Sequence, residues 1–341
     1  MGTIFFLYDP LNQKETYDSS SIKILFLGDF MIGDSYHGSA SHPFKSISSL
    51  FESKNDIIVN LETAITDRNQ TDNIGKTYLY KINETVLNEM NNRNITMVNL
   101  ANNHALDYGK EGFEDSINYL NLYNISYFGA GNNESSARRG IVKEYPKETT
   151  IGYLGYFEYR SIYDESYQFY AKNDDSGVAI LNFTNLRTDI SQIKNQTDLV
   201  IVSFHIGQNY NPDISQIHQD YAHYAIDCGA DAVISHSAHI ILPIEWYKNT
   251  PIFYSIGNSI FTTPGRFRYV DPIYHHGLGV TFIIENKEIT SIELTPFKTN
   301  NRETGYTPFF LSNNEIETVF NTILPLNKSY VIVDSSVRID Y

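Results

Sequence analysis

The sequence predicts an α/β layered fold, for three reasons. From residue 22 onward, short apolar runs alternate with amphipathic stretches, which is the pattern of strands and helices packed in layers. Several runs are continuously β-branched or apolar, as in strands buried on both faces of a parallel sheet. The composition, 41% hydrophobic and 19% charged, supplies enough apolar surface for a packed core. A chain of 341 residues has room for two domains, but we expect one elaborated domain, because single α/β domains often exceed ~150 residues.

The expected secondary structure follows from these runs. Strands are predicted over residues 22–28, 56–61, 95–101, 126–130, 150–155, 199–204, 232–235 and 251–257. The helical spacing of apolar residues predicts helices over 82–93, 111–123 and 214–228. Residues 278–284 and 289–297 are expected to form a hairpin. Ser312 and Glu315 have the spacing of a capping box, which predicts a last helix.

Domain boundaries are expected at both ends of this pattern. Residues 1–21 form a predicted polar tail, 22–310 the main domain, and 311–341 a C-terminal helix and strand extension. Between about residues 156 and 198 the periodicity weakens, and Tyr, Asp and Asn accumulate. We expect that stretch to be an insertion or a lid.

The charge of the chain limits its partners. It carries 40 acidic and 25 basic side chains, a formal net charge of −15. A negative field repels polyanions, which argues against nucleic acid and anionic membranes as partners. Any phosphate or carboxylate substrate therefore needs a local cation.

The single cysteine, Cys228, excludes an intramolecular disulfide. No run approaches the ~18–20 apolar residues of a membrane-spanning helix, and no signal peptide is visible. The default expectation is thus a soluble, cytoplasmic protein without a transmembrane segment.

Strand after strand ends in residue types that bind metal ions. The strand ends read Gly28-Asp29, Asn60-Leu61-Glu62, Asn102-Asn103-His104, Ser203-Phe204-His205, Ser235-His236-Ser237-Ala238-His239 and Gly257-Asn258. The carboxyl ends of parallel strands meet at one edge of a sheet, where ligand sites gather. Carboxylate, amide and imidazole groups there would suit Mn, Fe, Mg or Zn. Any one of these residues could be a turn or cap residue. Six such ends in succession favour a joint metal site.

The same residues resemble a known family. The strings around Gly28-Asp29, Asn60-Leu61-Glu62, Asn102-Asn103-His104-Ala105-Leu106-Asp107-Tyr108-Gly109, His205-Ile206-Gly207, Gly229-Ala230-Asp231 and Ser255-Ile256-Gly257-Asn258 stand in family order. Over roughly residues 22–262 the chain resembles the CapA/PgsA-type bacterial capsule synthesis (PGA_cap) family, a branch similar to the calcineurin-like metallophosphoesterases. The resemblance implies a single-domain, four-layer α/β/β/α sandwich with a metal site at one edge. It also implies one or two divalent metal ions: Mn, Fe, Zn or Mg.

The resemblance implies a role for each matching residue. The metal ligands it implies are Asp29, Glu62 as a bridging carboxylate, Asn103, His205 and His239. His104 matches the histidine that protonates the leaving oxygen in phosphoesterases. Asp107 could orient His104 or begin a helix.

Departures from the family pattern concern the nitrogen ligands. Ser237 stands where the family has a middle histidine, and Ala238 replaces a proline. His236 could rotate in and supply the missing nitrogen. Asp29-Phe30-Met31 also lacks the histidine that ordinary phosphoesterases carry two residues after the aspartate. The sequence therefore predicts metal positions that are poorer in nitrogen ligands than those of a typical phosphoesterase.

Substrate-binding residues are expected near the last strand end. Arg266 and Arg268 follow Asn258 closely, and arginine binds phosphate or carboxylate bidentately. The alternative is a solvated loop.

The sequence supports two functional hypotheses. The first is a metal-dependent hydrolase acting on a phosphoester or related substrate. The second is a non-catalytic accessory component of poly-γ-glutamate capsule synthesis or export, which binds the anionic polymer or a partner protein in a degenerate metal cleft. Members of the family are often anchored at the cell surface.

Overall fold

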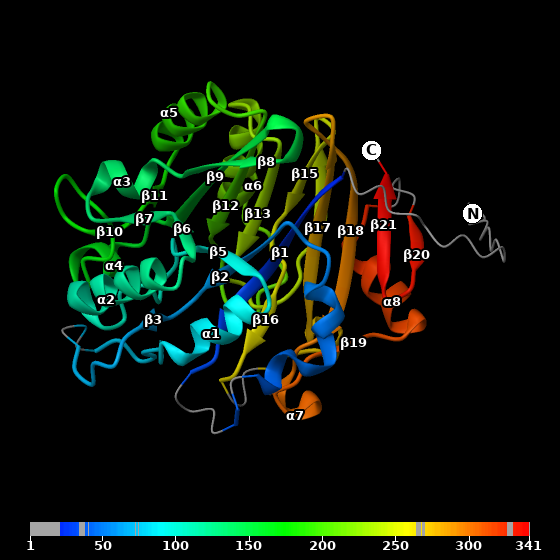
Figure 1. The fold of residues 1–341 in the computed structure, drawn as a ribbon, viewed down its shortest axis with the longest axis horizontal. Helices are drawn as coiled ribbons and strands as arrows, with labels where there is room; N and C mark the ends of the chain where they lie inside the picture. Colours follow the sequence, from blue (N-terminus) through cyan, green and yellow to red (C-terminus); the bar gives the residue numbers. More distant parts are fainter. Residues whose placement is uncertain are drawn as a thin grey trace.

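The computed structural model describes residues 21–33, 38–39, 41–71, 73, 75–263, 267, 270–325 and 330–340. Two large β-sheets pack against each other, and helices cover their outer faces (Figure 1). The larger sheet has the order β20-β21-β18-β17-β1-β2-β5-β6, with β16 beside β1 and β19 beside β18. The second sheet has the order β11-β9-β12-β13-β15-β14, with β8 beside β9.

The larger sheet has long, largely buried strands at its centre and short strands toward its edges. Its members are β1 (Ile22–Met31), β2 (Asp56–Leu61), β5 (Ile95–Asn99), β6 (Ser126–Phe128), β16 (Asn258–Phe261), β17 (His276–Glu285), β18 (Glu288–Lys298), β19 (Phe309–Phe310), β20 (Val331–Val333) and β21 (Ser336–Asp340). Strands β17 and β18 form the predicted hairpin.

The second sheet is built around three central strands. Its members are β8 (Ile141–Tyr145), β9 (Thr149–Glu158), β11 (Ile180–Leu181), β12 (Leu199–His205), β13 (Ala232–His236), β14 (Ile244–Tyr247) and β15 (Thr250–Phe253). Two short pairs lie outside both sheets: β3 (Ala64–Ile65) with β4 (Lys81–Ile82), and β7 (Ala130–Gly131) with β10 (Gly177–Val178).

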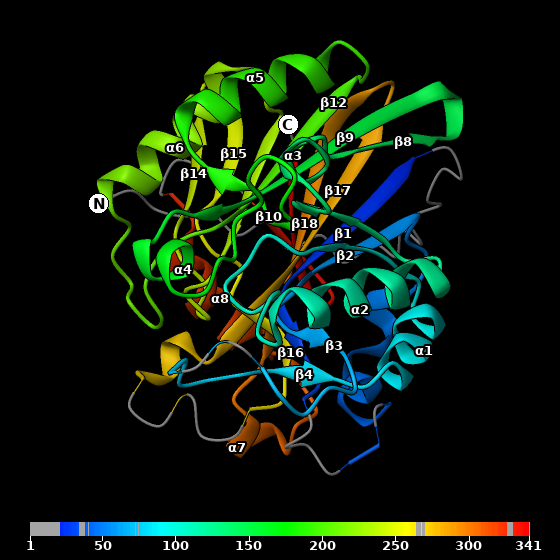
Figure 2. The same cartoon turned by 90° about the vertical axis from the view of Figure 1, so that its left-hand side faces the viewer.

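Helices complete the four layers. They are η1 (His42–Phe51), α1 (Thr85–Asn92), α2 (Gly109–Leu122), α3 (Glu134–Arg138), η2 (Pro146–Glu148), α4 (Ser161–Glu165), α5 (Phe183–Lys194), α6 (Gln216–Asp227), η3 (Pro272–Tyr274), α7 (Asn301–Thr304) and α8 (Asn313–Ile323). Helices α1 and α2 cover the larger sheet, and α5 and α6 cover the second sheet (Figure 2). The predicted α/β/β/α sandwich is confirmed. Helix α8 opens with the predicted capping box of Ser312 and Glu315.

Apolar side chains fill the space between the sheets. Phe26, Ile58 and Met97 of the larger sheet pack in one cluster with Tyr153 and Ile201 of the second sheet. These side chains are at most 2% exposed. The alternating strand positions point outward and pack against the helices instead, which explains why the strands are apolar on both faces.

The segment 156–198 differs from its expected role as an insertion. Strand β9 continues to Glu158, β11 pairs in parallel with β9, and helix α5 packs on the second sheet. Residues 159–178 lie outside the two large sheets, and they include α4 and β10. The helical spacing of Leu186, Ile190 and Ile193 indicates α5, but the surrounding polar residues weaken that signal.

Parallel pairing aligns the strand ends. In the larger sheet Asp29 lies opposite both Asn60 and Asn258. In the second sheet His205 lies opposite His236. These residues therefore reach the same edge of their sheets. Among the helices that the structure describes, none is both long and apolar enough to cross a membrane.

Candidate metal centre

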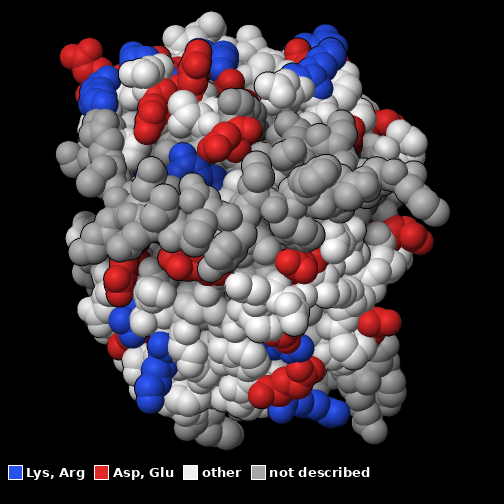
Figure 3. All heavy atoms as spheres, turned by 90° about the vertical axis from the view of Figure 1, so that its right-hand side faces the viewer, with Lys and Arg blue, Asp and Glu red and all other residues white. Residues whose placement is uncertain are grey.

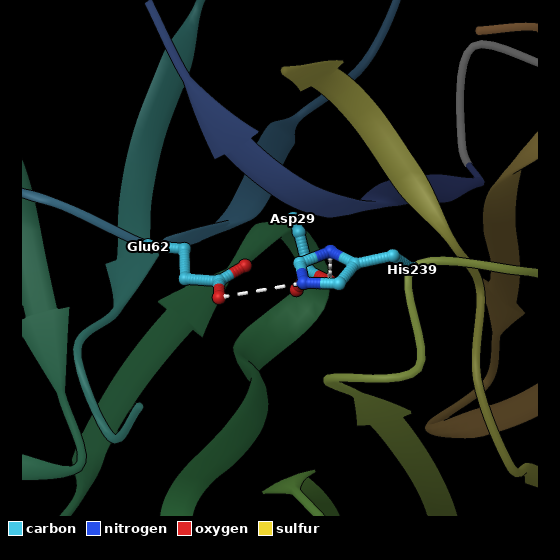
Figure 4. Close-up of side chains that lie close together, drawn as sticks. All are labelled: Asp29, Glu62 and His239. Atoms are coloured by element: carbon cyan, nitrogen blue, oxygen red, sulfur yellow. Dashed lines mark ion pairs between the residues drawn. The ribbon is translucent and has the colours of Figure 1, made fainter. Parts of the chain in front are cut away.

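Three buried side chains converge where strands of both sheets end (Figure 4). Asp29 lies two residues before the end of β1, Glu62 follows β2, and His239 lies in the loop after β13. Ligand atoms of the three residues lie within 4.8 Å of one another. His239 Nδ1 is 3.1 Å from Asp29 Oδ2, and His239 Nε2 is 3.8 Å from Glu62 Oε1. Two carboxylates and an imidazole at this spacing can hold a divalent metal ion.

Two more imidazoles flank this cluster. His205 Nε2 lies 4.0 Å from Glu62 Oε1, and His236 Nδ1 lies 3.9 Å from Asp29 Oδ1. Both nitrogens are buried, and within the described parts of the chain neither has a hydrogen-bond partner. Burying such an atom without a partner costs free energy. Metal coordination would satisfy such a nitrogen, so these residues suit a bound metal, although the convergent group of ligand atoms contains only Asp29, Glu62 and His239.

The protonation states suit metal binding. Burial lowers the pKa of His236 to about 4, although the charge of Asp29 opposes the shift. Burial also holds the pKa of His205 well below its usual range. Burial alone would raise the pKa of Asp29, but the hydrogen bond and charge of His239, with the other two histidines, lower it overall. The neutral imidazoles of His205 and His236 and the ionised carboxylate of Asp29 are the forms that bind metals.

The backbone brings Asp29 and the loop before Asn258 close together. Asp29 N donates a hydrogen bond to Gly257 O, at 3.0 Å. A Cβ atom at Gly28 would lie 1.8 Å from the same carbonyl oxygen. Only glycine permits this approach. Gly257 itself has a positive φ of 70°.

Asn258 lies beneath the cluster rather than in a substrate position. Its Oδ1 is 2.8 Å from His239 Nδ1, and its side chain is buried. Since Asn258 Oδ1 and Asp29 Oδ2 are both acceptors, His239 Nδ1 carries the proton and Nε2 faces Glu62. The substrate-binding role predicted for Asn258 is thus replaced in the structure by a contact that orients His239.

Ser237 does not take the place of an imidazole. Its hydroxyl donates to Gly207 O at 3.1 Å, and its backbone has a positive φ of 97°. His236 is the residue whose nitrogen turns toward Asp29. Asn103 lies in the loop after β5 with its Oδ1 buried, next to the Tyr163 side chain.

His104 and Asp107 form a pair beside the metal cluster. His104 Nδ1 lies 2.6 Å from Asp107 Oδ2 and donates to it, while His104 Nε2 lies 3.8 Å from Glu62 Oε1. Asp107 makes no helix cap, because α2 begins at Gly109 with Tyr108 at its N-cap. Of the two alternatives for Asp107, the contact with His104 is the one that the structure contains.

Sequence reasoning missed Lys76, which contacts Asp107 directly. Its side chain is 6% exposed, and Asp107 is fully buried. Burial lowers the pKa of Lys76, and the charge of Asp107 opposes this shift. Burial raises the pKa of Asp107, and Lys76 opposes it in turn. Lys76 lies in the loop between β3 and β4, where no motif identifies it.

A cleft of about 600 Å³ opens over Asn103 and His104. Its lining residues are Gly75, Lys76, Thr77, Tyr78, Tyr80, Asn103, His104, Arg160, Ile162, Tyr163, Tyr167, Asn209, Tyr210 and Thr263. Among the described residues of this lining, two are basic and none is Asp or Glu. Tyr210 also lies over the imidazole of His239, with ring centroids 5.7 Å apart. The cleft therefore lies beside the cluster, next to it through His104 and Tyr210, and its two basic residues favour anions.

Arg160 is the cation on the wall of this cleft. Its Nε and Nη2 hydrogen-bond Glu158 Oε2 at 2.9 and 2.8 Å, and Nη2 also donates to Gly207 O at 2.7 Å. Among the described residues, none accepts a hydrogen bond from Arg160 Nη1. The predicted anion-binding residues Arg266 and Arg268 lie outside the described residues.

The family model "Bacterial capsule synthesis protein PGA_cap" matches residues 23–263. The chain belongs to this family. Among PGA_cap relatives, it is 29% identical over 252 residues to the PGA biosynthesis protein CapA of Bacillus subtilis (strain 168), covering 72% of this chain and 65% of that protein. It is 30% identical over 215 residues to a probable polyglutamine synthesis accessory protein of Mycobacterium tuberculosis (strain ATCC 25618 / H37Rv), covering 60% and 54%. The matched region thus spans less than two thirds of either relative's length.

A solved structure of a 5'-nucleotidase from Candida albicans SC5314 also matches this PGA_cap chain. The match has a TM-score of 0.45 and 10% identity, and covers 82% of this chain and 52% of that one.

One further residue of the PGA_cap site was not predicted from the sequence. Asn60 Nδ2 donates to Asp29 Oδ1 at 2.7 Å and lies 3.2 Å from His205 Nδ1. Asn60 Oδ1 accepts from Asn99 Nδ2 at 2.9 Å. The available signal was its position at the end of a buried strand, two residues before Glu62.

Proposed function

We propose that this PGA_cap protein is a metal-dependent hydrolase that cleaves a phosphoester or related bond of an anionic substrate in capsule polymer synthesis. One observation carries the proposal: the ligand atoms of Asp29, Glu62 and His239 converge in a buried cluster, with His104 Nε2 at its edge. The pathway is inferred from the names of the relatives, which refer to PGA biosynthesis and polyglutamine synthesis.

Six residues would hold the metal: Asp29, Glu62, Asn103, His205, His236 and His239. A divalent ion, Mn, Fe, Zn or Mg, would activate a water molecule for attack and neutralise the negative charge that develops on the substrate. The nitrogen-rich part of this donor set favours Mn, Fe or Zn over Mg.

His104 is the general acid in this proposal. Its Nδ1 donates to Asp107, so Nε2 is the nitrogen that faces the cluster and the cleft. In a phosphoester, the bond between phosphorus and the leaving oxygen breaks as the water oxygen bonds to phosphorus. For this step His104 must be the imidazolium, with a proton on each ring nitrogen. The Nε2 proton passes to the leaving oxygen, Nδ1 keeps the proton that it donates to Asp107, and the attacking water releases a proton.

Arg160 binds the anionic part of the substrate in this proposal. Its Nη1 is available on a cleft wall whose described lining residues include no Asp or Glu. The acidic excess of the chain does not form a uniform negative surface, because acidic and basic side chains are interspersed on the face that carries β20 and β21 (Figure 3). A chain with a net charge of −15 needs a local cation to bind an anionic substrate, and Arg160 supplies that cation at the cleft.

The accessory hypothesis has one specific observation in its favour. Ser237 stands where the family has a histidine, and its hydroxyl hydrogen-bonds Gly207 O. Residue 237 therefore supplies no nitrogen to the cluster. A cluster weakened in this way could still hold a polymer or a partner protein of capsule synthesis without turnover.

Metal analysis combined with a substrate screen separates the two functions. The purified chain is analysed for bound metal and tested against phosphodiesters, phosphomonoesters and γ-glutamyl polymers. We expect bound metal, turnover of a phosphoester, and a ~10²-fold loss of kcat in His104→Ala, the lower part of the usual range for a general acid. A metal-free, inert chain that binds poly-γ-glutamate would instead support the accessory function. The variant Asp29→Asn, which removes a ligand charge, serves as the control for metal-dependent activity.

A further inference from the structure

Lys76 is more deeply enclosed than a surface lysine. Its ammonium contacts Asp107 Oδ1 and donates to Asn103 O at 2.6 Å. The rings of Tyr163 and Phe169 lie 5.6 and 5.1 Å from its nitrogen. Aromatic faces stabilise a desolvated cation, so this ammonium is held from several sides.

Lys76 and His104 share one carboxylate. The Lys76 nitrogen lies 3.3 Å from His104 Nδ1, but Nδ1 donates to Asp107 Oδ2 and an ammonium only donates. These two nitrogens therefore make no hydrogen bond to each other. Lys76 takes Oδ1, whereas His104 takes Oδ2, which also accepts from Tyr80 N at 2.6 Å. The carboxylate plane, and with it the ring of His104, is fixed from both sides.

Lys76 also contacts the main chain of the loop that contains Asn103, His104 and Asp107. Its bond to Asn103 O holds the main chain between the proposed ligand Asn103 and the proposed acid His104. The chain leading to Lys76 contacts the same loop, since Thr71 Oγ1 donates to Asp107 O at 2.7 Å. Because its charge is used by Asp107, Lys76 is not the cation offered to a substrate.

We propose that Lys76 is the positioning residue of the His104–Asp107 pair: it fixes Asp107 and the Asn103 main chain so that His104 presents Nε2 to the leaving oxygen. Its effect on turnover rests on the proposed hydrolase function. Its effect on the geometry of His104 does not.

The kinetic test varies the leaving group. Lys76→Met keeps the apolar stem and removes the charge. It is assayed on two phosphodiesters that share an ethyl phosphate group, one with a p-nitrophenyl and one with an ethyl leaving group. A p-nitrophenolate leaves without needing a proton, so a general acid matters chiefly for the ethyl ester. We expect kcat for the ethyl ester to fall ~10–100-fold, with a change below ~3-fold for the p-nitrophenyl ester and unchanged KM and metal content. In a His104→Gln background, Lys76→Met should have no further effect. Equal losses on both esters, or additive losses in the double variant, would overturn the proposal.

A spectroscopic test decides the geometry even if the chain is inert. In ¹⁵N-histidine-labelled protein, the Nδ1–H resonance of His104 is identified by its loss in His104→Gln. Lys76→Met should shift or broaden this resonance. The matched control Lys248→Met, an exposed lysine paired with Asp227, should leave it in place. An unchanged His104 resonance in folded Lys76→Met protein would refute the positioning role, whereas failure of the hydrolase proposal would appear as absent turnover in the unmutated chain.

Discussion

Asn60 Nδ2 lies 2.7 Å from Asp29 Oδ1, and this contact links two neighbouring strands directly beneath the metal cluster. The two residues are register partners in β1 and β2. The same amide nitrogen lies 3.2 Å from His205 Nδ1 in the other sheet. Asn60 therefore orients one candidate ligand from each sheet, although it is not a candidate ligand itself.

Replacing Asn60 should weaken metal binding without removing a ligand. We expect Asn60→Ala to lower metal affinity by about 10–100-fold, which is typical for residues that support metal ligands. Competition with a chelator measures this. The control is Asn121→Ala, an exposed residue of α2. An affinity equal to that of the unmutated chain would mean that Asn60 does not orient Asp29 or His205.

Removing the cleft cation should affect substrate binding more than chemistry. In Arg160→Met, we expect KM for an anionic substrate to rise about 10-fold or more, because a hydrogen bond to a charged group contributes about 1.5–3 kcal/mol. The metal content should stay the same. Arg187→Met, an exposed arginine of α5, provides the comparison. A loss confined to kcat would place Arg160 at the reacting atoms instead.

The candidate ligands at strand ends were predictable because a strand and the residue that follows it are adjacent in the sequence. Each candidate ligand except His239 directly follows or ends an apolar run, so periodicity and residue type suffice to identify it. Lys76 and Asn60 were not predictable in this way. Lys76 meets Asp107 across 31 positions of sequence. Asn60 stands at a strand end that the sequence identifies, but its contacts with Asp29 and His205 depend on two other strands. Their roles depend on which strands and loops become neighbours in space.

In the fold, too, elements that depend on nearby residues were predicted, and elements that depend on distant residues were not. Long apolar runs predicted the central strands, and a capping box predicted α8. Short pieces such as β16 were not predicted: the strand expected over 251–257 corresponds to β15, and β16 pairs with β1, more than 200 positions earlier in the sequence. Asn258, at its start, was predicted to contact substrate because neither its burial nor its contact with His239 can be derived from the local sequence.

The close approach at Gly28 should make this position intolerant of any side chain. A Cβ atom there would meet Gly257 O at 1.8 Å, and this atom is backbone and cannot rotate away. We expect Gly28→Ala to lose about 3 kcal/mol or more of the free energy of unfolding, as overpacking does in a rigid core. Urea denaturation followed by circular dichroism measures the change. Gly33→Ala is the control, because its Cβ would meet only the flexible Met31 side chain. Equal stability of both variants would contradict the expected strain.

The buried His218 should make the fold sensitive to acid. It lies in α6 with Nε2 3.0 Å from Ser235 Oγ, and burial lowers its pKa to about 3. The unfolded chain has a histidine pKa of about 6.5 and therefore binds a proton that the folded chain rejects. Stability is thus full above about pH 6.5 and is lost as the pH falls toward 3. At pH 4.5 the loss amounts to about 2–3 kcal/mol, at 1.36 kcal/mol per pH unit.

Comparing His218→Gln with the unmutated chain isolates this contribution. The glutamine can still hydrogen-bond Ser235 but does not titrate, so the stability of the variant should fall by about 2–3 kcal/mol less between pH 7.5 and 4.5. Both proteins are unfolded with urea in the presence of a chelator, because bound metal would add its own pH dependence through the histidines of the cluster. Parallel stability curves for the two proteins would show that His218 is protonated in the fold or reached by water, and that the acid sensitivity arises elsewhere.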